Sequence, residues 1–227
     1  MNTNSNEKDI LALETIAELK NYNSYTFNLI SQKISGKSIL DFGSGYGVFC
    51  QYMVKKGYKV NGFEINNIAY LESKERGINT YSKLNQIDKK FDTITSSNVL
   101  EHIEDDIIAI NQMRSLLVEK GTLILYLPAS QAVWTKMDDD VNHFRRYSKK
   151  DLHSKLESAN FEILESRYVD FIGWFTLIIF KIFKIKPKFN KKLIIFYDKF
   201  FFKFLKYLDI AFKNIIGKNI LVVARKN

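Results

Sequence analysis

Three glycines and two acids near the start of the chain have the types and spacing of a nucleotide-binding site. The glycines alternate after a short apolar run, at Gly43, Gly45 and Gly47. Asp41 ends that run, and Glu64 ends the next one, 23 residues later. Glycine allows positive φ and lets a ligand approach the main chain, and an acid at a strand tip can accept both hydroxyls of a ribose. This stretch therefore predicts a parallel strand–helix–strand unit with a nucleotide site at its mouth.

The glycine spacing distinguishes between cofactors. A dinucleotide fold uses G-x-G-x-x-G, whose third glycine would fall at Val48. The pattern here, D-x-G-x-G-x-G, resembles the first motif of class I methyltransferases, which bind S-adenosylmethionine. The resemblance implies that Asp41 serves the positive ammonium of the cofactor and that Glu64 serves its ribose. The alternative for the three glycines is a tight turn without a ligand.

A second group of polar residues, SSNVLEHIEDD, follows the predicted strand 91–95. In open parallel sheets a ligand lies beyond the carboxyl ends of the strands, so we expect Ser97 and Asn98 to face the same crevice. The string also resembles class I methyltransferases, in which this loop borders both cofactor and acceptor. Glu101 and His102 are its ionisable pair. The alternative is that Glu101 caps the following helix and that His102 only packs.

This string also bears on metal binding. In methyltransferases resembling those of quinone biosynthesis, an E-x-x-E-H string binds magnesium. Asn98 stands here where the first glutamate would be. One carboxylate and one imidazole are a poor shell for a hard cation, so we predict no required metal.

The third group lies in the segment Leu127–Leu152, which is rich in polar and aromatic residues. Its candidate functional residues are Trp134, His143, Arg145, Arg146 and Tyr147. His143 is our first candidate for a catalytic base, and His102 is the second. The arginine pair and the tyrosine would hold an acidic or phosphorylated acceptor. The alternative is that the acidic run 138–140 pairs with the basic run on the surface.

These strings together resemble a bacterial subgroup of class I methyltransferases that is typically found with sugar transferases acting on polyprenyl-phosphate carriers. The matching residues are Glu14, Glu18, Tyr22, Asn23, 98–106, Pro128, Ala129, Asp138, His143, Arg145, Arg146 and Tyr147. We assign to the cofactor Asp41, Gly43, Gly45, Gly47, Glu64, Ile65, Ser97, Asn98 and Tyr22. We assign to the acceptor Glu101, Trp134, Arg145, Arg146 and Tyr147.

The elements that must position these residues alternate between strands and helices. Apolar runs predict strands at 38–42, 58–63, 78–82, 91–95, 122–127, 161–169 and 220–224. We expect an α/β fold in one domain, 1–227: a doubly wound, mostly parallel seven-stranded, Rossmann-like sheet. Helices at 7–34, broken near 21–23, precede it. A helix at 105–117 is stopped by Gly121, and a helical insertion at 171–217 precedes the last strand.

The net charge of +9 is concentrated in this insertion. Residues 171–219 contain eleven lysines and two aspartates (11 − 2 = +9), so the rest of the chain is neutral in sum. Eleven of the eighteen phenylalanines are interleaved with them, which is typical of a lipid surface and not of a nucleic-acid site. In a helix 191–214 the lysines at 192, 199, 203, 206 and 213 would form one stripe. The alternatives are a lid on the domain or a dimer contact.

The remaining composition predicts a cytoplasmic protein with peripheral attachment to the inner face of the membrane. Cys50 is the only cysteine, the N-terminus has no apolar signal-like core, and no apolar run reaches the ~18 residues of a membrane span. We predict an S-adenosylmethionine-dependent methyltransferase acting on a hydroxyl or acidic group of a glycan- or lipid-linked acceptor. The rivals are a soluble small-metabolite methyltransferase with a helical lid, and a non-catalytic binding domain that keeps the fold.

Overall fold

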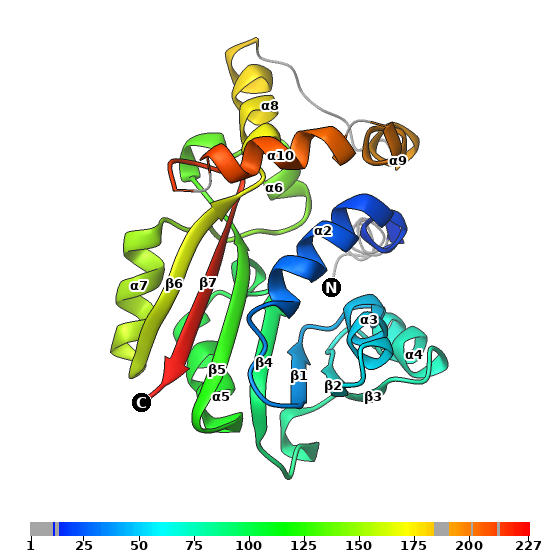
Figure 1. Cartoon of the computed structure of the whole chain (residues 1–227), viewed down its shortest axis with the longest axis vertical. Coiled ribbons are helices and arrows are strands. Elements are labelled where there is room, and N and C mark those ends of the chain that lie inside the picture. Colours follow the sequence, from blue (N-terminus) through cyan, green and yellow to red (C-terminus); the bar gives the residue numbers. More distant parts are fainter. Residues whose placement is uncertain (1–10, 12–13, 184–190, 201, 213) are drawn as a thin grey trace.

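The computed structural model describes residues 11, 14–183, 191–200, 202–212 and 214–227, the side chains of 193, 203–206 and 210 excepted. A seven-stranded sheet of order β3-β2-β1-β4-β5-β7-β6 forms its centre (Figure 1). Neighbouring strands are parallel except at β7, which lies antiparallel between β5 and β6. The predicted doubly wound, mostly parallel sheet is confirmed.

The strands agree with the predicted ones to within a few residues at each end. They are β1 Ser38–Phe42, β2 Lys59–Phe63, β3 Asn79–Tyr81, β4 Phe91–Ser97, β5 Leu117–Pro128, β6 Phe161–Val169 and β7 Asn219–Lys226. The labelled helices are α2 Lys20–Ser31, α3 Val48–Lys55, α4 Asn67–Glu75, α5 Asp106–Leu116, α6 Lys136–Asp140, α7 Lys149–Ser158, α8 Phe171–Ile182, α9 Lys191–Phe200 and α10 Phe202–Phe212. Three short 3₁₀ turns are η1 Leu84–Gln86, η2 Leu100–His102 and η3 Gln131–Val133.

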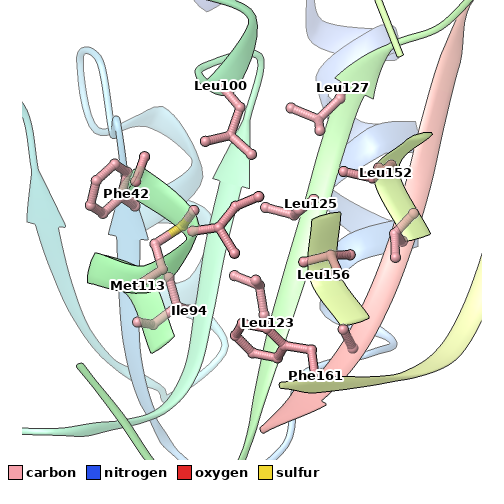
Figure 2. Close-up of a cluster of buried hydrophobic side chains, with 14 of the residues drawn as sticks. Phe42, Ile94, Leu100, Met113, Leu123, Leu125, Leu127, Leu152, Leu156 and Phe161 are labelled. Carbon is pink, nitrogen blue, oxygen red and sulfur yellow. The ribbon is translucent and has the colours of Figure 1, made fainter. Parts of the chain in front are cut away.

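Alternation along the central strands divides the core between the two faces of the sheet. On β5, Leu123, Leu125 and Leu127 belong to one buried cluster, and Ile124 and Tyr126 belong to the other. This is the period-two pattern of a strand that is covered on both faces. Helices α5 and α7 supply the first cluster, part of which Figure 2 shows, and α2 and α3 supply the second. The sheet is thereby a rigid support for the loops at its carboxyl edge.

Two predicted helix boundaries are wrong. Helix α5 ends at Leu116, and Gly121 lies inside β5 and does not stop the helix. Leu117 already pairs with Phe91 of β4, so the chain enters the sheet before it reaches the glycine. In the N-terminal region, residues 14–18 are helical and the break falls at Leu19, not near 21–23. Ile10 and Leu13, predicted on the first of these helices, lie outside the described residues.

Between β6 and β7 the chain forms α8, α9 and α10, which stand beyond the carboxyl edge of the sheet (Figure 1). The single lysine stripe predicted over 191–214 is wrong, because α9 ends at Phe200 and α10 begins at Phe202 in another direction. The side chains of 203, 206 and 213, which that stripe included, lie outside the described residues. None of the described helices has the length and apolarity to cross a membrane.

Candidate active site

The glycine turn has the backbone conformation that its sequence requires. Gly43, Gly45 and Gly47 have φ of 80°, 51° and 73°, a region that side-chain-bearing residues rarely adopt. The turn is fixed to the end of β2, because the Gly43 and Ser44 amides donate to the Phe63 carbonyl at 2.8 and 3.0 Å. The turn therefore stands between the carboxyl ends of β1 and β2, where the sequence predicted the cofactor.

Glu64 holds this turn from the tip of β2. One carboxylate oxygen accepts the Gly45 amide at 2.8 Å, and the other accepts the Asn66 amide at 2.8 Å. Its side chain is 9% exposed, and burial raises its pKa. The acid predicted for the ribose thus also orders the glycine turn, a second role that the sequence did not reveal.

Asp41 is a buried carboxyl at the end of β1. Thr95 of β4 donates to one of its oxygens at 2.7 Å, and the Cys50 thiol lies 3.6 Å from the other. Burial and, to a smaller extent, the neighbouring carboxylate of Glu64 raise the pKa of Asp41 to about 7. A positive group brought by a ligand would favour the ionised form of this carboxyl. This environment suits the ammonium predicted from the sequence.

The loop after β4 forms the second wall of the site. A Cβ added to Gly43 would come within 2.3 Å of the Val99 side chain, so this loop lies directly against the glycine turn. Asn98 has φ of 53° and donates its amide to the Tyr126 carbonyl at 2.8 Å. Ser97 is half-buried at the end of β4. The structure therefore brings these predicted cofactor residues together.

Two other residues assigned to the cofactor lie in different settings. Ile65, after Glu64, is 79% exposed at the tip of β2. Tyr22 of α2 reaches the sheet, where its hydroxyl lies 3.2 Å from the Tyr126 hydroxyl and accepts from Asn219 at 3.3 Å. Burial raises the pKa of Tyr22, so its hydroxyl is neutral. Cofactor binding by both residues stays a prediction.

His143 is held by Asp138 in the loop after β5. Its Nδ1 lies 2.9 Å from an Asp138 oxygen that also accepts Arg146 Nε at 2.8 Å, and the other oxygen accepts the Thr135 amide at 2.8 Å. Burial works against ionisation of Asp138, but the bonds from His143 and Arg146 lower its pKa to about 2. An ionised carboxylate only accepts, so in the neutral imidazole Nδ1 carries the proton and Nε2 keeps its lone pair.

Glu101 faces that lone pair. His143 Nε2 lies 3.9 Å from Glu101 Oε1, and the Phe144 amide donates to the Glu101 carbonyl at 2.8 Å. The carboxyl is fully buried, and neither oxygen has a hydrogen-bond partner among the described residues. Burial raises its pKa to about 8. The alternative that Glu101 caps the next helix is wrong, because the Asp105 carboxylate accepts the Ile108 amide at the start of α5.

His102 completes a group of three possible metal ligands. Each of Glu101, His102 and His143 offers one ligand atom, and the three atoms lie within 4.8 Å of one another. Two imidazoles and one carboxylate fit a zinc-like ion better than magnesium, which prefers oxygen ligands. Burial and the neighbouring His143 lower the pKa of His102 to about 4, so its ring is neutral at pH 7. The expectation of no required metal stays a prediction.

Both arginines of the predicted anion clamp are paired with carboxylates of the chain. Arg146 binds Asp138, and Arg145 binds the Asp106 carboxylate at 2.9 Å and the Glu104 carbonyl at 2.6 Å. Tyr147 is fully buried and donates to Asp106 at 2.8 Å. These residues hold the loop in place, and the Arg146–Asp138 bridge is one contact between the acidic and basic runs of the kind that the sequence left open. Acceptor binding by Arg145 and Arg146 stays a prediction, made through the guanidinium N–H groups that these contacts do not use.

Trp134, also assigned to the acceptor, lies beside the histidine. Its ring centroid is 6.5 Å from that of His143, and its Nε1 donates to Asp139 at 2.9 Å. Its role in acceptor binding stays a prediction. The sequence reasoning missed Asp138 as a functional residue, although the D-x-x-x-x-H string contained it. An acid five residues before a candidate base could have indicated the partner.

Comparison with known proteins identifies the family. The model of the methyltransferase domain family matches residues 16–166, which is more than half of the chain. The chain belongs to this family. The predicted class is therefore confirmed, while the subgroup associated with polyprenyl-phosphate sugar transferases remains a proposal.

Curated relatives of this methyltransferase chain include two ubiquinone biosynthesis O-methyltransferases. The protein from Haemophilus ducreyi is 28% identical over 121 residues, covering 45% of this chain and 51% of the relative. The protein from Histophilus somni is 31% identical over 112 residues, covering 41% and 47%. The chain thus matches about half the length of these relatives.

Solved structures show the same fold. A SAM-dependent methyltransferase from Archaeoglobus fulgidus has a TM-score of 0.61 at 16% identity, covering 92% of this chain and 94% of that one. Magnesium protoporphyrin IX methyltransferase from Synechocystis, with bound SAH, has a TM-score of 0.57 at 14% identity, covering 93% and 84%. At such identities the likeness concerns the fold alone.

Proposed function

We propose that this methyltransferase transfers a methyl group to a hydroxyl of a glycan- or lipid-linked acceptor, with His143 as the base. The methyl donor is S-adenosylmethionine, as predicted from the glycine motif. The observation that carries the proposal is the Asp138–His143 pair, whose Nε2 faces the Glu101 carboxyl, a group without a hydrogen-bond partner among the described residues. The pair stands on the loop after β5, and Glu101 stands on the loop after β4, which abuts the glycine turn through Val99.

The cofactor half of the site positions the donor. Glu64 would accept the ribose hydroxyls while it holds the Gly45 amide, and Asp41 would accept the ammonium. When bound, the sulfonium supplies a methyl group that needs no further activation. The protein contributes the alignment of donor and acceptor, which can supply ~7–11 kcal/mol of the barrier.

The acceptor half supplies proton transfer and polar recognition. The acceptor oxygen would form its bond to the methyl carbon as the carbon–sulfur bond breaks and S-adenosylhomocysteine leaves. The hydroxyl proton would pass to His143 Nε2, and Asp138 would stabilise the resulting imidazolium. A base of this kind contributes ~10²–10⁴ in rate. Glu101, neutral below about pH 8, donates a hydrogen bond to a second acceptor oxygen, which satisfies a buried group that otherwise has no partner. An acidic acceptor would need neither base nor proton transfer, so this geometry favours a hydroxyl.

The class of acceptor is supported by two observations. The curated relatives are named for O-methylation, which agrees with a histidine base. The insertion above the carboxyl edge combines lysine with aromatic residues, a composition suited to the membrane surface where a lipid-linked acceptor resides. We therefore place the acceptor at the cytoplasmic face of the membrane.

Labelled-methyl transfer tests the proposal. The purified chain and methyl-labelled S-adenosylmethionine are incubated in parallel with a membrane-lipid extract and a soluble-metabolite extract. We expect label in a lipid or lipid-linked glycan, released by acid as a methyl ether and not by mild base as an ester. Label found only in soluble metabolites would establish the small-molecule rival. Cofactor binding without transfer to either extract would support the non-catalytic rival.

A further inference from the structure

The insertion α8–α10 has an inner and an outer face with different chemistry. Its stretch 171–219 contains eleven lysines but only two acids, Asp198 and Asp209. Both acids are buried, at 5% and 6% exposure. The distribution of these two charges decides what the outer surface can bind.

Asp198 joins α9 to the N-terminus of α2. Its carboxylate accepts the amides of Asn21 at 2.9 Å and Tyr22 at 2.7 Å, and its carbonyl accepts the Asn21 side-chain amide at 2.8 Å. A carboxylate at a helix N-terminus satisfies amides that have no partner within the helix. This acid of the insertion therefore faces the body of the protein and contributes no charge to the outer surface.

Asp209 does the same for α8. Its oxygens accept the amides of Asp170 and Phe171 at 2.8 and 2.7 Å and the hydroxyl of Tyr25 at 2.8 Å. The buried Phe202 makes edge-to-face contacts with Tyr22 and Tyr25 of α2. The insertion thus packs on α2, and both of its acids accept hydrogen bonds from α2 or from the start of α8.

The outer face is apolar and aromatic. Nine of the eighteen exposed large hydrophobic residues of the described chain belong to the insertion, and these include six of the seven exposed aromatics. They are Phe175, Ile182, Phe183, Phe196, Tyr197, Phe200, Tyr207, Leu208 and Ile215. Helix α8 has no buried residue at all, and Ile182 and Phe183 at its end are 68% and 71% exposed.

On α9 the exposed residues combine the two chemistries in one stripe. Lys192, Phe196, Lys199 and Phe200 are all exposed, and their i, i+4, i+7, i+8 spacing places them on one side of the helix. The Lys199 ammonium lies 5.3 Å from the centre of the Phe200 ring, and the Phe196 and Phe200 rings are 4.7 Å apart. Long cationic side chains beside aromatic rings suit the boundary between lipid headgroups and acyl chains.

We propose that the outer face of α8 and α9 binds the surface of a bilayer that contains anionic phospholipid. Among the described residues of the insertion the exposed charge is lysine alone, so an anionic surface complements it, and the same face of a second copy would repel it. Attachment is peripheral, with aromatic side chains entering the interface. The inference goes beyond the proposed function and does not depend on it, because none of these residues belongs to the site.

Vesicle flotation of the whole chain tests this binding. We expect the protein to float with vesicles of phosphatidylcholine and phosphatidylglycerol, to stay behind with phosphatidylcholine alone, and to be released by high salt. Lys192→Glu/Lys199→Glu and Phe196→Ser/Phe200→Ser should each lower the vesicle partition coefficient at least about tenfold. Matched controls, Lys55→Glu/Lys59→Glu and Val54→Ser on the exposed surface of α3 and β2, should leave it unchanged.

Circular dichroism and S-adenosylhomocysteine binding verify that each variant is folded. Equal flotation with neutral and anionic vesicles, or equal losses in the control variants, would overturn the proposal. A third result would also overturn it: the wild type does not bind vesicles but forms a stable dimer in sedimentation, and Phe196→Ser/Phe200→Ser makes it monomeric. Failure of flotation together with intact methyl transfer to a lipid-linked acceptor would remove the membrane surface and leave the proposed function standing.

Discussion

The two halves of the candidate site differ in the partners that surround their buried acids. In the cofactor half, Asp41 and Glu64 are buried acids with raised pKa values, held by neutral hydrogen-bond donors. In the acceptor half, Asp138 and Asp106 have lowered pKa values, because hydrogen bonds and charges from histidine, arginine and lysine partners outweigh burial. Glu101 is the exception there, since burial without such a partner raises its pKa to about 8. We expect a positive ligand to complete the first half, whereas the paired acids of the second half already have cationic partners within the chain.

This difference explains which groups each half offers to a ligand. Arg145, Arg146 and Tyr147 are engaged with carboxylates of the chain, whereas the Glu101 carboxyl has no hydrogen-bond partner among the described residues and faces His143 Nε2. Three changes, at His143, Glu64 and Asp41, should each damage one half without the other, and metal removal should damage neither.

Replacement of His143 by alanine should have the largest effect. We expect kcat to fall ~10²–10⁴-fold, because the base is lost, with S-adenosylhomocysteine affinity unchanged. Asp138 keeps its bond to Arg146, so the loop should stay folded. His153→Ala on α7 is the matched control and should have wild-type turnover. Steady-state kinetics and calorimetry give both readouts, and full turnover by His143→Ala would remove the base assignment.

Glu64→Ala should damage the opposite half. The change removes the carboxylate that accepts the Gly45 and Asn66 amides and that is proposed to bind the ribose hydroxyls. We therefore expect cofactor affinity to fall roughly 10²-fold. Turnover at saturating cofactor should change far less. Glu72→Ala, an exposed acid on α4, serves as control. A kcat defect with normal affinity would place this acid in the chemistry and contradict the division.

The pKa of Asp41 predicts a smaller, pH-dependent effect. Since the free chain holds this acid at about pKa 7 and the cofactor ammonium favours its ionised form, binding should release a proton near pH 6. Affinity should then fall about tenfold per unit below pH 7. Titrations in two buffers with different ionisation heats measure the release, which Asp41→Asn should abolish. For the unliganded chain, the raised pKa means that stability falls as pH rises from about 4 to 7.

Metal removal should have the smallest effect of all. If His143 Nε2 is a base and not a ligand, a chelator should leave turnover unchanged, and added zinc should inhibit by occupying Glu101, His102 and the same nitrogen. Activity is assayed after dialysis against chelator and again with metal restored. Loss of turnover that zinc restores would replace the base mechanism with a metal-assisted one.

The cofactor half was largely predictable from the sequence because its chemistry is local. Gly43, Gly45 and Gly47 dictate their own backbone conformation, and the strand that follows must deliver Glu64 to the same edge. The acceptor half depends on contacts between distant segments. Whether Arg145 is free or paired is decided by Asp106, 39 residues earlier, and no local pattern reveals that pairing.

The insertion shows the same limit of local reasoning. Its lysine and phenylalanine content was evident, but a continuous helix over 191–214 was the wrong assumption. Helix α9 ends at Phe200. Asp198 near its end caps α2 by accepting the amide of Asn21, which lies 177 residues earlier in the sequence. The sequence therefore predicted the composition of this surface correctly and its geometry incorrectly.

Titration calorimetry of the chain with S-adenosylmethionine, alongside Gly43→Ala, tests the central claim most directly. A methyl group at position 43 would meet the Val99 side chain at 2.3 Å and would need a side chain at φ of 80°. We predict micromolar binding to the wild type and at least about a hundredfold loss in Gly43→Ala, with His143→Ala binding normally. No binding to the wild type, or equal binding by wild type and Gly43→Ala, would contradict the account.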